Sequence, residues 1–232
     1  MLPIRDDTPR STVPFINYFL ILLNLVVFFF EWQLQASGGA RALQGFEFHF
    51  AFIPRNVEAW LGGSLPASYA LLPFFTSMFL HASWWHVIAN MWFLNIFGDN
   101  VEDRLGHFGY LLFYLVCGLG ANLAHFIFNL NSGLPAVGAS GAIAGVMGAY
   151  FVLYPRGRVL TWWLIFVVWL PAWLVLGYWF LGEFLSGAAS LFTSSGGAGG
   201  VAFWAHVGGF VTGVLLIKLL PTRKNVYAFE EY

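Results

Sequence analysis

The sequence is built from apolar runs that are long enough to cross a lipid bilayer and that carry almost no charge. No charged residue lies between Arg10 and Glu31, or between Arg158 and Glu183. Charged residues make up 9% of the chain and hydrophobic residues 59%, whereas an ordinary soluble domain is roughly 25% charged. The chain is therefore expected to be an integral membrane protein that uses the lipid bilayer as its surroundings.

Six apolar runs fit membrane spans of about 20 residues each. They cover residues 15–34, 84–101, 108–129, 140–154, 159–181 and 201–220. The predicted fold is all-α: a polytopic membrane bundle of six transmembrane helices that forms one domain. A cleavable signal peptide is not expected, because the first run is a full span.

The ten basic residues predict how this bundle is oriented. If the N-terminus is cytoplasmic, only Arg41 and Arg55 lie outside, which agrees with the excess of Lys and Arg usual on the cytoplasmic side. Both termini are then cytoplasmic, and spans 84–101, 140–154 and 201–220 run parallel. The remaining segments are two cytoplasmic tails (1–13 and 221–232), an external loop (35–83) and an external cap loop (182–200).

The net charge and the cysteine content narrow the range of possible functions further. The formal net charge of -1 leaves no basic surface for nucleic acid. The single cysteine, Cys117, excludes an internal disulfide and lies mid-span beside Gly118 and Gly120, where it is read as a packing residue. Neither a cofactor nor a metal is expected.

Two polar residues stand at the start of apolar spans and suggest a nucleophile and its base. Ser140 lies in Gly-Ala-Ser-Gly, and His206 in Ala-His-Val-Gly-Gly. Each lies fourteen residues before the end of its span, about 21 Å above the cytoplasmic boundary at 1.5 Å per residue. Both residues are therefore expected at one level, about 10 Å below the external surface.

Small residues indicate that the two spans also approach each other laterally. Ala144 and Gly148 share the helix face of Ser140, and Gly209 and Gly213 share that of His206. Small residues let helix backbones pack closely in a membrane. Such packing would bring a serine hydroxyl within about 2.6–3.2 Å of an imidazole that activates it.

An oxyanion needs hydrogen-bond donors near the depth of Ser140, and a histidine base is often oriented by an acid at the same depth. His86 reaches nearly the level of Ser140, and Asn90 lies one turn lower, so their side chains and the Ser140 backbone N–H are candidate oxyanion donors. Every acidic residue, including Glu183, is expected at a terminus, near a membrane boundary or in a loop. The sequence therefore predicts a Ser-His dyad without a carboxylate.

Other uses of these polar residues are less well supported by the sequence. His81 and His86 are five residues apart and have no neighbouring carboxylate, unlike the helical His-Glu-x-x-His zinc motif. His81 is interpreted as a structural residue that hydrogen-bonds loop backbone. Asp99 has no second intramembrane aspartate with which to form an aspartyl protease pair.

The ordered set of motifs resembles the rhomboid family of intramembrane serine proteases, bacterial type. The matching residues are His81-x4-His86-x3-Asn90, Gly98-Asp99-Asn100-Val101-Glu102-Asp103-Arg104-Leu105-Gly106, Gly138-Ala139-Ser140-Gly141, and Ala205-His206 with Gly209 and Gly213. This resemblance implies that Ser140 is the nucleophile, His206 the general base, and His86 and Asn90 oxyanion donors. It also implies transmembrane protein substrates and a bacterial inner membrane location.

The chain departs from some family members at two places. Ala144 stands where some members have an aromatic residue that stacks under the catalytic histidine, so the resemblance leaves the support of His206 open. The Trp-Arg pair that some members carry in the first external loop is absent, although that loop keeps an apolar aromatic set: Phe46, Phe48, Phe50, Phe52 and Trp60.

Hydrolysis below the membrane surface requires a polar cavity that is open to water and protected from lipid. The cap loop 182–200 is a candidate cover for this cavity. The aromatic span 159–181 is a candidate lateral gate for substrate, although its aromatic residues equally suit a lipid-facing surface and an interfacial belt. Two alternative functions stay open. A non-catalytic rhomboid-like protein would bind membrane clients, although the presence of both Ser140 and His206 favours an enzyme; a transporter is less well supported, since no inverted repeat is evident.

Overall fold

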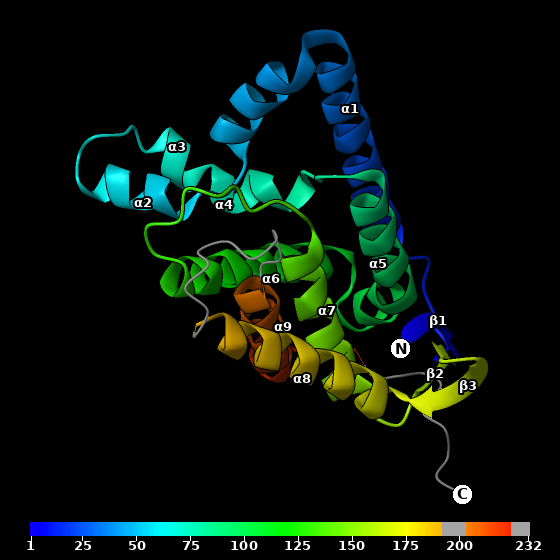
Figure 1. The fold of residues 1–232 in the computed structure, drawn as a ribbon. Coiled ribbons are helices and arrows are strands. Elements are labelled where there is room, and N and C mark those ends of the chain that lie inside the picture. Colours follow the sequence, from blue (N-terminus) through cyan, green and yellow to red (C-terminus); the bar gives the residue numbers. More distant parts are fainter. Residues whose placement is uncertain (192–202, 224–232) are drawn as a thin grey trace, which may run out of the picture.

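A computed structural model describes residues 1–191 and 203–223. This part of the chain is mostly helical, with one small sheet (Figure 1). The elements are β1 (Leu2–Asp6), α1 (Phe15–Phe50), α2 (Pro54–Leu61), α3 (Ser68–Leu71), α4 (Pro73–Thr76), η1 (Ser77–Phe79), α5 (Trp84–Leu105), α6 (His107–Phe128), α7 (Ser140–Leu153), β2 (Arg158–Trp163), β3 (Phe166–Pro171), α8 (Ala172–Ser190) and α9 (Phe203–Leu219).

Helix α7 is the centre of the bundle. It contacts α5, α6, α8 and α9, which surround it in Figure 1, and every residue from Gly141 to Tyr150 is buried. Helices α1, α6 and α8 are long and apolar enough to cross a membrane, whereas α7 and α9 are apolar but shorter. Many large apolar side chains of α1 are exposed, such as Phe19, Leu22 and Val26, which suits a lipid-facing surface.

Small residues let α7 and α9 approach closely. A methyl group added to Gly209 would overlap the Gly141 carbonyl, one on Gly213 would overlap the Gly145 carbonyl, and one on Gly148 would overlap backbone of α9. The predicted close approach of these two helices is therefore confirmed. It brings the N-terminal end of α7 beside that of α9.

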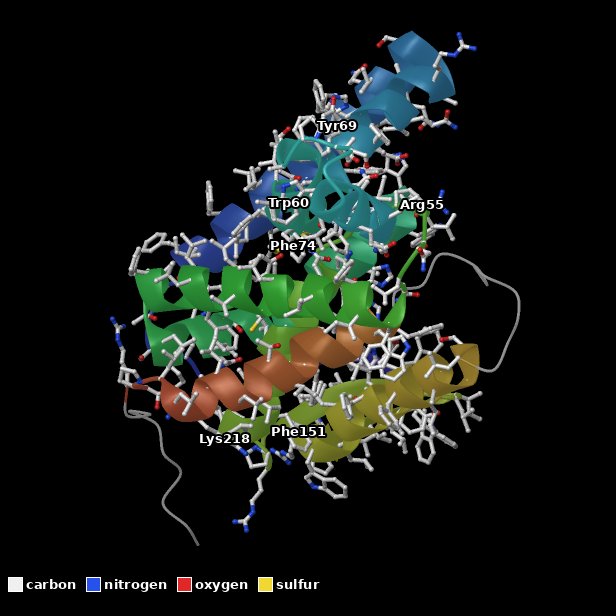
Figure 2. The ribbon with its side chains drawn as sticks, turned by 90° about the vertical axis from the view of Figure 1, so that its left-hand side faces the viewer. Arg55, Trp60, Tyr69, Phe74, Phe151 and Lys218 are labelled. Atoms are coloured by element: carbon white, nitrogen blue, oxygen red, sulfur yellow. The ribbon has the colours of Figure 1, made fainter. Side chains whose placement is uncertain are left out.

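The expected external loop 35–83 is largely helical. Helix α1 continues to Phe50 and changes direction at Gly39, whose φ of 70° suits a residue without a side chain. The following short helices enclose a separate apolar cluster around Phe52, against which Trp60 and Phe74 pack. Figure 2 shows Trp60, Phe74 and Tyr69 together at one end of the molecule, opposite Lys218 and Phe151.

The sequence predicts an all-α fold with a fifth transmembrane helix over 159–181. Both predictions are wrong where this helix was expected to begin. Residues 158–171 form the antiparallel hairpin β2–β3, and β1 pairs with β2 to complete a three-stranded sheet. The segment is rich in β-branched and aromatic residues, which favour strands, and the helix begins only after Pro171. The expected cap loop is helical as far as Ser190, and 192–200 lie outside the described residues.

A buried acidic cluster at the end of α5 anchors the N-terminal segment. Glu102 is fully buried and accepts hydrogen bonds from the backbone N–H groups of Ile16 (3.0 Å) and Asn17 (2.7 Å) in the first turn of α1. Asp103 accepts hydrogen bonds from Ser11 and Thr12. Glu102 thus satisfies N–H groups of α1 that the helix itself cannot pair, and Asp103 holds the segment that precedes the helix.

Candidate active site

The loop before α7 places Ser140 at the first position of that helix. Gly138 has a φ of 127°, a conformation that side chains disfavour, and a methyl group there would come within 2.8 Å of the His86 ring. The Gly138 N–H donates a hydrogen bond to the Ser77 carbonyl (2.9 Å). Glycine thus lets α5 approach the loop that presents Ser140.

Ser140 and His206 are in hydrogen-bond contact. The distance from Ser140 Oγ to His206 Nε2 is 2.7 Å, although the residues are 66 positions apart in the chain. The pair joins the first residue of α7 to the first turn of α9. The structure therefore brings together the two residues that the sequence places at one depth, at a distance that permits proton transfer.

The expectation that no acidic residue joins this pair is wrong. The distance from His206 Nδ1 to Glu183 Oε2 on α8 is 2.8 Å, and both side chains are largely buried, with 14% and 18% exposed. The Trp179 ring lies one turn earlier on α8, with its centroid 5.9 Å from that of His206. Glu183 and Trp179 thus support His206 from α8, whereas the expected aromatic position on α7 is Ala144.

Because the β2–β3 hairpin replaces the first part of the predicted fifth span, that prediction did not place Glu183 beside His206. A helix over 159–181 ends before Glu183, while the observed α8 continues to Ser190 and carries Glu183 beside His206. One sequence signal was available: Glu183 is the first charged residue after Arg158 in a long apolar segment. A carboxylate within apolar sequence indicates a partner or a function.

A cavity of about 450 Å³ opens beside the Ser140–His206 pair. It is lined from α5, α7, α8, α9 and the segments before α5 and α7, by Ala82, Ser83, His86, Ala89, Asn90, Phe93, Ala136, Val137, Ser140, Ile143, Ala144, Met147, Trp179 and His206. Both predicted oxyanion donors, His86 and Asn90, therefore face the cavity that contains Ser140. Asn90 Nδ2 is buried and has no hydrogen-bond acceptor within the described residues, so this donor is available to a ligand.

His81, the other histidine of the His81-x4-His86 motif, does not line this cavity. His81 is buried, its backbone N–H donates to Glu31 Oε2 (3.0 Å), and its ring lies edge-on to that of His86 at 5.1 Å between centroids. Burial lowers the pKa of His81 to about 3, which keeps its ring neutral. Within residues 1–191 and 203–223, no three His, Cys, Asp or Glu side chains gather as metal ligands would.

Comparisons with known proteins agree on one family. The family model described as Rhomboid domain matches residues 69–223. The chain is 32% identical over 209 residues to Rhomboid-like protein 11, chloroplastic, of Arabidopsis thaliana, covering 88% of this chain and 64% of that protein. It is 29% identical over 228 residues to RHOMBOID-like protein 1 of the same plant, covering 91% and 54%.

A further similarity is to Rhomboid protein 1, mitochondrial, of Saccharomyces cerevisiae, which is 31% identical over 147 residues that cover 60% of this chain and 39% of the yeast protein. The chain thus spans between about two fifths and two thirds of the length of these relatives. The names of two of these three relatives refer to an organelle, the chloroplast or the mitochondrion.

Proposed function

The chain belongs to the rhomboid family, and from this membership and the geometry of the cavity we propose that it is an intramembrane serine endopeptidase. Its substrates are membrane proteins, cleaved in or near a transmembrane segment. The observation that carries the proposal is the 2.7 Å contact between Ser140 Oγ and His206 Nε2 at the wall of the cavity. The family includes inactive members, so membership alone does not imply catalysis. The contact between Ser140 and His206 is what supports the proposed activity.

In the acylation step, His206 Nε2 takes the hydroxyl proton of Ser140 while Oγ attacks the scissile carbonyl carbon. The tetrahedral intermediate collapses when the C–N bond breaks and His206 gives its proton to the leaving amine. An acyl-serine and a free amine result. Water then attacks the ester carbon and gives its proton to His206, and the return of that proton to Ser140 Oγ releases the carboxylic acid product.

The negative charge that develops on the carbonyl oxygen needs hydrogen-bond donors. Asn90 Nδ2 is a buried donor with no acceptor in the described chain and faces the same cavity as Ser140. The backbone N–H of Ser140 belongs to the first turn of α7, where N–H groups have no intrahelical acceptor. His86, also on the cavity wall, is the third donor of the proposed oxyanion hole.

The proposed orientation in the membrane puts α2–α4 and the cavity toward the exterior and the sheet toward the cytoplasm, with six spans. Figure 2 places Lys218 at the end opposite Trp60 and Tyr69. Arg104 Nε donates a hydrogen bond to the carbonyl of Arg223, just beyond the end of α9. Cations therefore gather at the proposed cytoplasmic end. The location in a bacterial plasma membrane stays a prediction.

The test is a labelling and cleavage assay on the full chain in proteoliposomes. A fluorophosphonate probe should label the wild type and a Ser37→Ala control, which removes an exposed hydroxyl of α1, but not Ser140→Ala. Ser140→Ala and His206→Ala should each abolish cleavage of a single-span substrate while the protein stays folded. Cleavage by Ser140→Ala at the wild-type site would refute the serine assignment.

The same assay separates the enzyme from a non-catalytic rhomboid-like protein. A wild-type chain that binds a single-span client but is neither labelled nor able to cut it would contradict the proposed activity. That result would favour a protein that only binds membrane clients. The paired presence of Ser140 and His206 at 2.7 Å supports the enzyme.

A further inference from the structure

Helix α8 brings a carboxylate to the side of His206 that faces away from Ser140. Glu183 Oε2 lies 2.8 Å from His206 Nδ1, while His206 Nε2 lies 2.7 Å from Ser140 Oγ. The two ring nitrogens therefore have different partners. Three side chains from three helices form a continuous chain of contacts.

Packing between α8 and α9 fixes the position of this carboxylate. The rings of Phe180 and Phe210 stack at 4.6 Å between centroids, and Phe184 meets Trp204 edge-on at 6.1 Å. One turn beyond, a methyl group on Gly187 would come within 3.1 Å of the Trp204 ring. These contacts on both sides of Glu183 hold α8 close to α9.

The carboxylate can select one tautomer of the imidazole. An ionised carboxylate only accepts hydrogen bonds, so His206 Nδ1 must carry the proton that lies between them. Nε2 then keeps its lone pair and accepts the hydroxyl proton of Ser140. When that proton arrives, the imidazolium lies against a negative charge that was already in place.

We propose that Glu183 is a positioning residue that completes a Ser140–His206–Glu183 triad. It holds His206 in the tautomer that can act as a base and stabilises the imidazolium that forms during each step. The proposal rests on the proposed peptidase function of Ser140 and His206. Together with the Trp179 ring, whose centroid lies 5.9 Å from that of His206, Glu183 supports this imidazole in a chain that has Ala144 where some family members have an aromatic residue.

Other ionisable groups near His206 do not offer this role. His86 on α5 and His125 on α6 are the further titratable side chains that interact with it electrostatically. Both are cations when protonated and so cannot stabilise an imidazolium. Glu183 is the acidic side chain that contacts His206 in the described part of the chain.

The test compares Glu183→Gln and Glu183→Asp with wild type in proteoliposomes, with Tyr178→Phe as the matched control. Tyr178→Phe removes a polar group from the exposed face of the same helix. In Glu183→Gln the amide can donate to Nδ1 and so favour the wrong tautomer. We expect kcat to fall by as much as about 10⁴-fold with little change in KM, as when an amide replaces the carboxylate of a serine protease triad.

The conservative variant separates a positioning role from a general packing role. Glu183→Asp should recover part of the lost kcat because it restores a carboxylate. Glu183→Gln with kcat within threefold of wild type would overturn the proposal.

A measurement without substrate distinguishes this failure from failure of the peptidase function. In ¹⁵N-histidine-labelled protein, assigned with His206→Ala, the His206 ring should carry its proton on Nδ1 in wild type and Tyr178→Phe but not in Glu183→Gln. The same tautomer in wild type and Glu183→Gln would overturn the positioning role. If wild type is not labelled by the fluorophosphonate but its His206 tautomer still differs from that of Glu183→Gln, only the proposed peptidase function is refuted.

Discussion

Gly209 of α9 packs against the backbone carbonyl of Gly141 in α7 so closely that a methyl group on Gly209 would overlap that oxygen. The contact lies one residue beyond Ser140 and three beyond His206. It therefore sets the separation of the two helices at the place where the proposed nucleophile meets its base.

Gly209→Ala should push α9 away from α7. It should lower kcat strongly while the protein still folds. We expect a loss of about 1–3 kcal/mol in the free energy of unfolding. The expected fall in kcat is on the order of 10²-fold, because a misplacement of about 1 Å can have that effect. Thermal unfolding and cleavage in proteoliposomes measure the two effects.

Gly177→Ala is the matched control, since its added methyl group would meet only Phe151, at an ordinary distance of 3.9 Å. This variant should keep both stability and activity. Equal activity of Gly209→Ala and Gly177→Ala would contradict the view that close packing at Gly209 aligns the pair.

Asn90→Ala should lower kcat by about 10²–10³-fold if Nδ2 is a principal oxyanion donor. Its buried donor has no acceptor in the described chain, so its removal should change stability little. Asn24→Ala is the control: Asn24 is also a buried amide, but its Nδ2 is bonded to the Leu20 carbonyl outside the cavity. That variant should lose stability and keep kcat, whereas a raised KM with unchanged kcat in Asn90→Ala would make Asn90 a binding residue.

Much of the proposed site could be predicted because it depends on helical periodicity and span depth. The positions of Ser140, His206, Gly209 and Gly213 follow from a repeat of 3.6 residues along straight apolar helices. Both helices begin at the same end of the bundle, so equal distances from their far ends imply equal depth. The structure has the two side chains in contact.

Glu183, the carboxylate of the proposed triad, could not be placed in the same way. Residues 159–171 are apolar apart from Thr161, and a nearly continuous apolar run does not distinguish a buried helix from a strand. A start at 159 instead of Ala172 moves the end of the helix to a point before Glu183. The course of 35–83 was also not predicted, because short helices around Phe52 depend on tertiary packing and not on periodicity.

Asp6→Asn should stabilise the protein increasingly as the pH rises. Burial raises the pKa of the Asp6 carboxyl above its ordinary value of 3.8, although hydrogen bonds from Tyr150 and Thr8 lower it in part. Because the pKa of Asp6 is raised in the folded state, wild type has the full stabilisation from the neutral Asp6 carboxyl only below the ordinary pKa. This stabilisation is lost as the pH rises through the folded-state pKa. Asparagine keeps an acceptor for Tyr150 and does not ionise.

The measurement is the difference in Tm between Asp6→Asn and wild type from about pH 4 to pH 8. The difference should grow over the lower part of this range and then level off. A constant difference, or one that shrinks as the pH rises, would show that burial does not penalise the ionised Asp6.

Substrate cleavage should depend on how easily the transmembrane helix of the substrate unwinds. In a helix the scissile carbonyl is hydrogen-bonded and covered by side chains, so Ser140 can attack only after local unwinding. Unwound backbone in lipid leaves polar groups unsatisfied, at several kcal/mol each. The cavity beside Ser140, with Asn90 and His86 on its wall, is where those groups can be paired again.

Cleavage should therefore favour substrate segments near the external surface that contain Gly, Pro or other helix-weakening residues, with a small side chain at the scissile position. The test replaces these residues by Leu in a cleaved substrate, confirms that the substrate still inserts, and measures turnover. A matched substrate carries the same number of Leu replacements in the inner half of its helix and should be cut at the original rate. If the outer-half variant is also cut at the original rate, unwinding does not limit the reaction, whereas the role of Ser140 and His206 is decided by their own variants.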